Sequence, residues 1–513
     1  MTTARRIRVG ALAAALAASG VLATGVGERV AVAAPRAAGS WEYPNGDLDN
    51  TRDVVGSTIT SANVGSLKVA WTFSITGKAA KSLDKLGSLV ANPVVVGSVV
   101  YVQDMYSNVY ALSLATGAKL WEYWLGQALR SGPGPNGVAV SRGVVYALAP
   151  TEAFALDAST GHPIWIDRHL LGHGQGTFGM QPQVANGRVY LASQYGAAPG
   201  GGILLALRAS NGRRLWTFNT VKTPDAGVES LGLGAGGAWE TPLVGSDGSV
   251  TYGTGNPYQT VGSAISEPAR QLYTNSLVNL DAATGRLRWY YQGVPNDFKD
   301  YDMQASPIAA RVGATPVVIG GGKMGFVYEM NAHDGRLVWK APVGEHNGHD
   351  NDSLNALEHR GTLKLPFSFL PGSFGGILTN MAVAGQSVFV DTCDLELRYT
   401  KLSQVTGQAT ATTTAKGEVE ALNLATGKVE WDTKVSGLPL GAATVVNDLV
   451  VTTLFNGVLI ALNRQTGAIV YHRKLAGATN ATLAVAGNTI IVPEGDPGTT
   501  GVGHPAIVAY RLG

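Results

Sequence analysis

Residues 109–121 read VYALSLATGAKLW, and this stretch decides the fold. An apolar run ending in Ala111-Leu112 is followed by Thr116-Gly117, and Trp121 stands four residues after the glycine. The same pattern returns along the chain, in Thr116-Gly117 with Trp121, Thr160-Gly161 with Trp165, Asn211-Gly212 with Trp216, Thr284-Gly285 with Trp289, Asp334-Gly335 with Trp339, Thr426-Gly427 with Trp431 and Thr466-Gly467 with Tyr471. One copy alone is an ordinary hairpin, but seven copies in register indicate a repeat protein.

Each repeat predicts two short β-strands joined by a tight turn. Glycine tolerates the positive φ that such a turn requires, and the large ring can pack against the turn of the neighbouring repeat. Most of the aromatic residues are about 40 to 50 residues apart, which is the length of a four-stranded blade. With Trp71 as an eighth aromatic residue, the sequence predicts an all-β, eight-bladed β-propeller. We expect its last strand, residues 506–510, to close the ring by pairing with an N-terminal strand.

Two intervals between these aromatic residues are longer than the others, Trp216 to Trp289 and Trp339 to Trp431. They must carry insertions, and insertions on a rigid scaffold are where function tends to sit. The second insertion contains a cluster that could supply metal ligands: Glu345, His346, His349, Asp350 and Asp352. Because the cluster lacks the fixed register of a helical metal site, a solvated insertion loop is the preferred interpretation.

The composition indicates a large globular fold and gives no sign of a nucleic-acid partner. Of 513 residues, 45% are apolar and 14% charged, and the net charge is +2. Residues 1–33 are interpreted as a signal peptide, because the basic stretch 5–8 precedes an Ala-rich apolar run and Ala31-Val32-Ala33 offers a cleavage site. The alternative is an uncleaved N-terminal anchor. We therefore expect a secreted or extracytoplasmic protein, exported by the Sec or twin-arginine route, in which residues 34–513 form one propeller domain with no transmembrane segment.

A second pattern in the N-terminal region is more specific than the repeats. Asn45-Gly46-Asp47-Leu48-Asp49-Asn50-Thr51-Arg52, followed by Asn63-Val64-Gly65-Ser66-Leu67-Lys68-Val69-Ala70-Trp71, resembles the start of the quinoprotein alcohol dehydrogenase family. The repeats resemble that family's tryptophan-docking motifs, so the resemblance covers about residues 40–513. It implies oxidation of a small-molecule or polymeric alcohol, or of a polyol, with pyrroloquinoline quinone (PQQ) and a Ca²⁺ or lanthanide ion. Since Cys393 is the one cysteine and there is no Cys-x-x-Cys-His haem motif, the electrons would pass to an external acceptor.

Two motifs in the first long interval resemble cofactor-binding segments of the family. Trp239, in Gly236-Gly237-Ala238-Trp239, resembles the tryptophan on which the PQQ rings lie, and a flat indole suits stacking on a flat quinone. Asn256, in Gly253-Thr254-Gly255-Asn256-Pro257, resembles the family's metal-binding asparagine, whose neutral oxygen suits a hard cation. The alternatives are a core tryptophan at 239 and a tight turn stabilised by Asn256.

The resemblance also implies catalytic roles for a short polar segment and a glycine-flanked lysine. Asp300-Tyr301-Asp302 stands where the family has Trp-Asp-Tyr, with Lys299 at the Trp position. Asp300 then corresponds to the metal-bound carboxylate that takes the alcohol proton, and Asp302 to a second carboxylate that marks lanthanide-using members. Lys323 corresponds to the basic residue that contacts the quinone oxygens and stabilises their negative charge. The alternatives are a polar surface loop and an exposed lysine at a strand end.

Three places depart from the family pattern. The metal-binding glutamate is missing, and Gln194 is the only candidate ligand in its segment, although an ungapped alignment places Ala197 there. The family's adjacent-cysteine disulfide is absent, because residues 132–137 contain no sulfur. The late tryptophan near the cofactor corresponds to Leu440. An uncharged Gln194 oxygen would bind a cation more weakly than a carboxylate, and Asp302 would compensate by giving the site two carboxylates and two amides.

The sequence leaves two functions open. The first is a PQQ-dependent dehydrogenase with Asp300 and Lys323 as catalytic residues. The second is a non-catalytic propeller that acts as an extracytoplasmic binding or scaffold protein. The joint presence of Trp239, Asn256, Asp300 and Lys323 favours the enzyme, because a scaffold has no need of this set.

Overall fold

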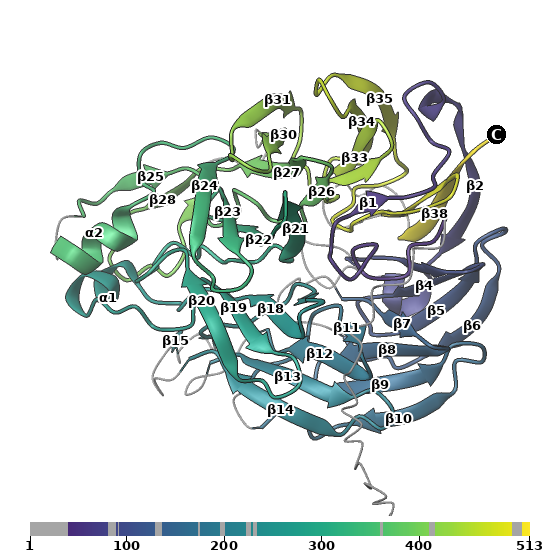
Figure 1. Cartoon of the computed structure of the whole chain (residues 1–513), viewed down its shortest axis with the longest axis horizontal. Helices are drawn as coiled ribbons and strands as arrows, with labels where there is room; N and C mark the ends of the chain where they lie inside the picture. The colour runs from purple at the N-terminus through teal and green to yellow at the C-terminus, as the bar shows by residue number, and fades with distance from the viewer. Residues whose placement is uncertain are drawn as a thin grey trace, which may run out of the picture.

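The computed structural model describes residues 39–80, 89–90, 92–128, 136–172, 175–194, 201–221, 227–228, 233–359, 363–409, 416–494 and 505–513. Four-stranded antiparallel sheets follow one another around a central axis, which confirms the eight-bladed β-propeller (Figure 1). The blades are formed by β3–β6 (Val94–Val96, Val99–Gln103, Val109–Ser113, Lys119–Tyr123), β7–β10 (Ala139–Ser141, Val144–Ala149, Glu152–Asp157, Pro163–Asp167), β11–β14 (Gln183–Ala185, Arg188–Ala192, Ile203–Arg208, Arg214–Asn219), β17–β20 (Leu243–Val244, Ser249–Gly253, Ser276–Asp281, Leu287–Gln292), β21–β24 (Ile308–Val312, Thr315–Gly322, Phe326–Asn331, Leu337–Pro342), β26, β27, β30 and β31 (Ala382–Ala384, Ser387–Asp394, Lys416–Asn423, Val429–Val435), β32–β35 (Thr444–Val446, Leu449–Leu454, Val458–Asn463, Ile469–Lys474), and β36–β38 with β2 (Ala484–Ala486, Thr489–Glu494, Ala506–Leu512, Leu67–Ser74).

The position of a strand within its blade explains its composition. β33, in the middle of its blade, reads LVVTTL and is buried throughout, because neighbouring blades cover both of its faces. β35, the outer strand of the same blade, reads IVYHRK and alternates between exposed and half-buried residues. Apolar runs therefore lie near the axis, and the charged residues lie on the outer edge.

The ring is closed by strands from the two ends of the chain. β2 pairs in antiparallel register with β38, with Trp71 opposite Ala509 and Leu67 opposite Leu512. The prediction that residues 506–510 pair with an N-terminal strand is therefore confirmed. The 3₁₀ turns Val64–Ser66 and Gly77–Ala80 flank β2 on either side.

The repeated Gly and Trp residues lock one blade to the next, as the repeats predicted. Gly117 has a φ of 71°, and a Cβ placed on it would lie 2.6 Å from the Trp71 ring of the preceding blade. The indole N–H of Trp71 also donates a hydrogen bond to the Leu114 carbonyl at 2.9 Å. We call each such junction between neighbouring blades a seam. Six further seams repeat this arrangement: Trp121 on Gly161, Trp165 on Gly212, Trp216 on Gly285, Trp289 on Gly335, Trp339 on Gly427 and Trp431 on Gly467.

The eighth seam is different. There, the next blade carries the chain ends where the other blades carry the glycine turn, so Tyr471 has no such turn to pack on. Arg473, also on β35, takes over the connection: its guanidinium donates a hydrogen bond to Leu67 O at 2.9 Å and lies 4.7 Å from the Tyr510 ring. This seam is held by an arginine, where the other seven use a stacked indole.

The segment before β2 connects several blades from the inner side of the ring. Trp41 forms a bridge with Val95 of β3, and β1 (Asp53–Val54) pairs in parallel with β32. Arg52 is fully buried between them. Its guanidinium donates hydrogen bonds to Asn45 Oδ1 at 3.0 Å, Ala443 O at 3.0 Å, Thr444 Oγ1 at 2.7 Å and Leu483 O at 3.0 Å.

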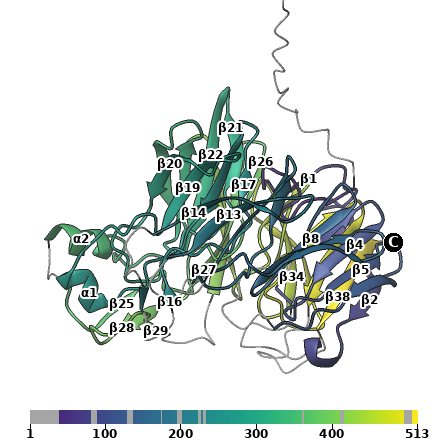
Figure 2. The ribbon, with the colours of Figure 1, turned by 90° about the horizontal axis from the view of Figure 1, so that it is seen from below.

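The insertions predicted in the two long intervals lie together at one side of the ring (Figures 1 and 2). They contain β15 and β16 (Gly227–Val228, Leu233–Gly234), α1 (Val261–Ser266), α2 (Asp352–His359) and a three-stranded sheet of β25, β28 and β29 (Phe367–Phe369, Leu397–Tyr399, Gln408–Ala409). We call α1, α2 and this sheet the cap. Phe369 and Tyr399 of the cap share one hydrophobic cluster with Phe298 and Tyr301 of the propeller, so the cap rests on the segment that carries Asp300. In the described part of the chain no helix is long and apolar enough to cross a membrane.

Candidate active site

Four of the predicted site residues converge from two adjacent blades. Asn256 follows β18, Lys323 follows β22, and Asp300 and Asp302 lie in the segment that joins these two blades, between β20 and β21. All four are at most 8% exposed. The alternatives of a polar surface loop and an exposed lysine are therefore wrong.

Lys323 lies between the two carboxylates. Its Nζ atom is 3.0 Å from Asp300 Oδ2 and 2.5 Å from Asp302 Oδ2. Asn256 joins the same pair, because its Nδ2 atom donates hydrogen bonds to Asp300 Oδ1 and, at 2.8 Å, to Asp302 Oδ1. The backbone N–H of Asn256 also donates to Asp302 Oδ1 at 2.8 Å. One ammonium and one amide thus hold two aspartates together.

Burial and charge set the protonation of this group. Burial raises the pKa of Asp300 to about 8; Lys323 opposes this shift, and the carboxylate of Asp302 adds to it. Burial disfavours the charged form of Lys323, but Asp300 and Asp302 outweigh it and raise the Lys323 pKa above its usual value. The site therefore keeps its ammonium, and its two carboxylates compete for that single positive charge.

Trp239 lies beside these carboxylates. A Cβ placed on Gly255 would lie 2.9 Å from the Trp239 ring and 3.0 Å from Asp302 Oδ1, so only a glycine lets the indole approach this closely. Trp239 is 9% exposed. The indole is thus next to the charged group, as a stacking platform would require, and its role in cofactor binding stays a prediction.

Gln194 is placed differently from the other predicted metal ligands. Its Nε2 atom donates a hydrogen bond to Gly179 O at 3.0 Å, and its Oε1 atom is buried without a hydrogen-bond partner among the described residues. Its backbone carbonyl packs against Gly237, two residues before Trp239. Gln194 therefore borders the site through its backbone, while its side chain turns toward Gly179.

The remaining departures from the family pattern are only partly described. Ala197 and residues 132–135 lie outside the described residues, so the structure does not bear on the lost glutamate position or the lost disulfide. Leu440 is buried, and its N–H donates to Thr453 O at 3.1 Å within its own blade.

The structure adds two residues that the sequence did not single out as functional. Lys299 is fully buried, and its Nζ atom lies 3.0 Å from Asp352 Oδ2 at the start of α2. The rings of Phe298, Tyr301 and Phe369 surround this ammonium at 5.5–5.6 Å. Asp297 is the second residue, and its carboxylate receives backbone N–H groups on both sides of Asp300.

The interpretation of residues 345–352 as a solvated loop is wrong in part. His349 Nδ1 is 2.8 Å from Asp352 Oδ2, and His346 Nδ1 is 2.7 Å from Asp350 Oδ1. These His–Asp pairs are half-buried between the propeller and the cap, and Asp352 also binds Lys299. The physical reason is that packing of α2 on the Asp300 segment removes this part of the insertion from solvent.

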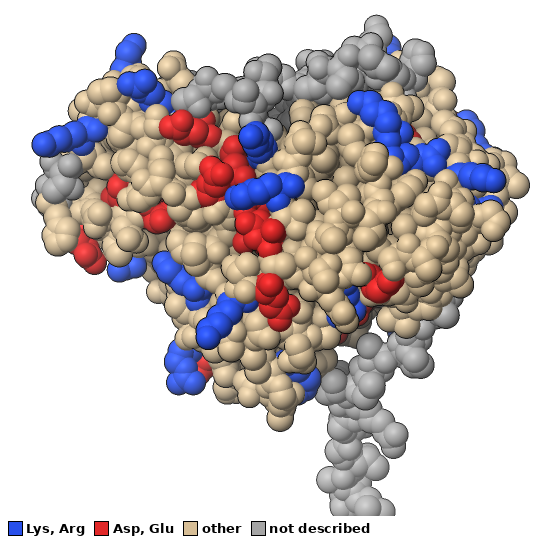
Figure 3. Space-filling model, turned by 90° about the horizontal axis from the view of Figure 1, so that it is seen from above, with Lys and Arg blue, Asp and Glu red and all other residues tan. Residues whose placement is uncertain are grey.

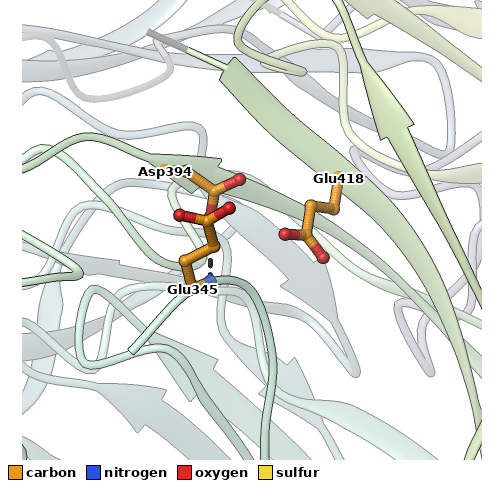
Figure 4. Close-up of side chains that lie close together, drawn as sticks. All are labelled: Glu345, Asp394 and Glu418. Carbon is orange, nitrogen blue, oxygen red and sulfur yellow. Dashed lines mark hydrogen bonds between the residues drawn. The ribbon is translucent and has the colours of Figure 1, made fainter. Parts of the chain in front are cut away.

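A second acidic group lies apart from this site. The carboxylate oxygens of Glu345, Asp394 and Glu418 lie within 4.8 Å of one another (Figure 4). Lys434 contacts Glu418 and lies 3.8 Å from Glu345, so a cation of the chain already neutralises part of the group. In Figure 3, acidic side chains gather in a band on one face with basic side chains beside them, as in a surface ion-pair network.

Comparison with known proteins connects this chain to a family. The model of the "Glucose/ethanol/alcohol dehydrogenase, beta-propeller domain" family, named PQQ, matches residues 41–347, and that of "Outer membrane protein assembly factor BamB" matches residues 400–502. The quinohemoprotein alcohol dehydrogenase of Comamonas testosteroni is 28% identical over 355 residues, covering 60% of this chain and 48% of the relative. The polyvinylalcohol dehydrogenase of a Pseudomonas species is 25% identical over 400 residues, covering 70% and 56%. The chain thus spans about half the length of the curated relatives it matches.

Solved structures agree on the fold. The quinohemoprotein alcohol dehydrogenase from Comamonas testosteroni superposes with a TM-score of 0.79 at 21% identity, covering 94% of this chain and 82% of the other. A europium-containing methanol dehydrogenase gives 0.77 at 20% identity, covering 92% and 98%. BamB from Moraxella catarrhalis gives 0.53 at 14% identity, covering 87% and 97%. Since the first family model covers more than half of the chain, the protein belongs to the β-propeller family of the PQQ-dependent alcohol dehydrogenases.

Proposed function

We propose that the protein is an extracytoplasmic PQQ-dependent dehydrogenase that oxidises an alcohol or polyol and passes the electrons to an external acceptor. The observation that carries this proposal is the convergence of Asn256, Asp300, Asp302 and Lys323 in one buried group beside Trp239. Homology to PQQ alcohol dehydrogenases supports an oxidoreductase. Export rests on the interpretation of residues 1–33, which lie outside the described residues.

The donor set fits a hard cation. Asp300 and Asp302 offer carboxylate oxygens, which are ligands that calcium-type ions prefer. Asn256 adds an amide oxygen only if its amide turns over, because its Oδ1 atom accepts the backbone N–H of Tyr258 at 2.6 Å while its Nδ2 atom faces the two aspartates. Two buried carboxylates share the single ammonium of Lys323, so a further cation would relieve their excess negative charge. These three residues would therefore hold Ca²⁺ or a lanthanide. Gln194 joins them only if its amide rotates away from Gly179.

The same geometry assigns the steps that this chain's residues perform. Bound PQQ would supply the two-electron acceptor for the alcohol. Trp239 would support its ring system, because an indole stacks well on a flat aromatic surface. Asp300 would accept the hydroxyl proton of the alcohol in its ionised form. Because burial raises its pKa to about 8, that form would predominate at neutral pH only when a bound cation favours it. Lys323 would stabilise the negative charge that develops on the quinone oxygens as the cofactor is reduced.

Binding tests this proposal first. The purified protein is titrated with PQQ in the presence of Ca²⁺, La³⁺ or no metal, and tryptophan fluorescence is followed. We expect saturable, metal-dependent quenching that is lost in Trp239→Ala. Trp124→Ala is the matched control, because Trp124 is 54% exposed and should leave the quenching intact. Absence of quenching with every metal contradicts the proposal.

Turnover provides the second test. Replacement of Asp300 by alanine is expected to reduce kcat by about 10²- to 10⁴-fold, the usual contribution of a general base. Retained turnover in this variant would contradict the role of Asp300.

A binding or scaffold protein is the second candidate. It is favoured by the match of residues 400–502 to the BamB family model. This candidate accounts for the blades but gives no reason for two buried aspartates around a lysine, so it would gain support only if PQQ failed to bind.

A further inference from the structure

Asp300 has a backbone conformation that needs external support. Its φ is 61°, in the left-handed region, which a residue with a side chain adopts at a cost of about 1–2 kcal/mol. In this conformation its carboxylate reaches Asn256 and Lys323 from the segment between two blades. Something in the surroundings must therefore hold the backbone on either side of Asp300.

The carboxylate of Asp297 supplies this support. Its Oδ1 atom accepts a hydrogen bond from the backbone N–H of Lys299 at 2.9 Å, and its Oδ2 atom accepts one from the backbone N–H of Tyr301 at 2.8 Å. These two amides belong to the residues directly before and after Asp300. The two oxygens of one carboxylate thus accept the backbone N–H groups of the residues directly before and after the candidate base.

Asp297 is itself held in place. It is 1% exposed, and Asn275 Nδ2 donates to its Oδ2 atom at 3.2 Å. The same Asn275 amide donates to Tyr301 O at 2.5 Å, and Gln259 Nε2 donates to Asp297 O at 2.9 Å. A buried carboxylate that accepts hydrogen bonds from backbone and side-chain amide N–H groups fixes the conformation of the backbone, and it does not act mainly as a partner in a salt bridge.

We propose that Asp297 is a positioning residue of the active site, which fixes the backbone at residues 299 and 301 so that the Asp300 carboxylate meets Asn256, Lys323 and the bound metal. This inference rests on the proposed function for its kinetic consequence but not for its structural one. Asp297→Asn keeps the size of the side chain and one acceptor oxygen, while its NH₂ group would face one of the two amides.

The structural consequence is tested on the protein without cofactor. In a crystal structure of Asp297→Asn, we expect Asp300 to leave the left-handed region and to lose contact with Asn256 or Lys323. An Asp300 that keeps its φ and both contacts overturns the inference, whether or not the wild type binds PQQ. This outcome is therefore separate from failure of the proposed function, which the wild-type titration alone decides.

The functional consequence is tested on the loaded enzyme. We expect Asp297→Asn to raise the metal concentration for half-maximal PQQ quenching about 10- to 100-fold. We expect kcat to fall about a hundredfold while KM changes little, because displacement of a catalytic group affects chemistry more than binding. Unchanged kcat and unchanged metal dependence would overturn the proposal.

A matched control separates positioning from loss of stability. Glu494 is 2% exposed and accepts a backbone N–H, that of Ala476, at 2.7 Å on the opposite side of the ring. Glu494→Gln should lower Tm as Asp297→Asn does, with kcat and metal dependence preserved; equal losses in both variants would overturn the inference. If Asp297→Asn does not fold, Asn275→Gly offers a milder change, because Asn275 has a φ of 50° that glycine accepts. It should shift kcat and metal dependence in the same direction.

Discussion

Lys299 Nζ lies 3.0 Å from Asp352 Oδ2, so a fully buried lysine next to Asp300 is paired with the first residue of helix α2. This pair fastens the cap to the propeller at the candidate site. Lys299→Met removes the buried ammonium and leaves the Asp352 carboxylate with its His349 contact, and we expect a loss of about 3–5 kcal/mol in the free energy of unfolding. The double variant Lys299→Met/Asp352→Asn should recover part of this loss in urea unfolding. Strictly additive losses would show that the two side chains do not interact.

The seam glycines should be sensitive to a single methyl group. Gly285 has a φ of 71°, and a Cβ on it would lie 2.6 Å from the Trp216 ring. Gly187 has the same φ of 71°, with nothing within 4 Å of its Cβ position. Both alanine variants are destabilised by the positive φ, which disfavours a residue with a Cβ. Only Gly285→Ala adds a steric clash with the indole, which costs about 1–3 kcal/mol. We therefore expect a clearly lower Tm for Gly285→Ala; equal Tm values would contradict the role of this contact.

Stability should depend on pH through Glu240. Burial raises its pKa from 4.5 to about 8, with Asn380, Arg52 and Ser306 opposing the shift. The folded state therefore disfavours the ionised form, and this carboxyl lowers stability progressively as the pH rises from about 4.5 to about 8. Glu240→Gln removes that dependence. The Tm of the variant relative to the wild type should be higher at pH 8.5 than at pH 5.5, and a difference that does not change with pH would contradict the assignment.

Asp302 should decide which ion the site prefers. Its carboxylate is fully buried and already engages Asn256 and Lys323, so it is placed to share a cation with Asp300. A trivalent ion is attracted more strongly than a divalent ion to a second carboxylate ligand. Asp302→Ala is expected to weaken La³⁺-dependent PQQ quenching more than Ca²⁺-dependent quenching. Equal weakening with both ions would separate Asp302 from metal choice.

The sequence predicted the ring because the glycine and the tryptophan that each blade contributes to its two seams are close together in the chain. Gly117 and Trp121 are four residues apart, and the contact of each with its neighbouring blade repeats, so the pattern could be seen without any three-dimensional information. The eighth seam could not be predicted this way. Arg473 acts there because the chain ends replace the turn, and an arginine in an outer strand carries no signal of that kind.

The sequence predicted those residues of the candidate site whose side chains contact one another. Asp300 and Lys323 stand in recognisable motifs and do converge. Asp297 was missed because it acts on backbone amides, which every sequence supplies. Lys299 was missed as a structural residue because its partner, Asp352, comes from an insertion whose docking site cannot be read from its composition.

The pairing of β2 with β38 constrains the order in which this protein can fold. Strand β2 is synthesised long before its partner β38, so the ring stays open until residues 506–512 have been made. Until then the blades at both ends present unpaired backbone groups, to which another chain could add. A chain that stopped before residue 506 would keep this gap permanently, and we expect such a fragment to aggregate where the chain that includes β38 stays dispersed.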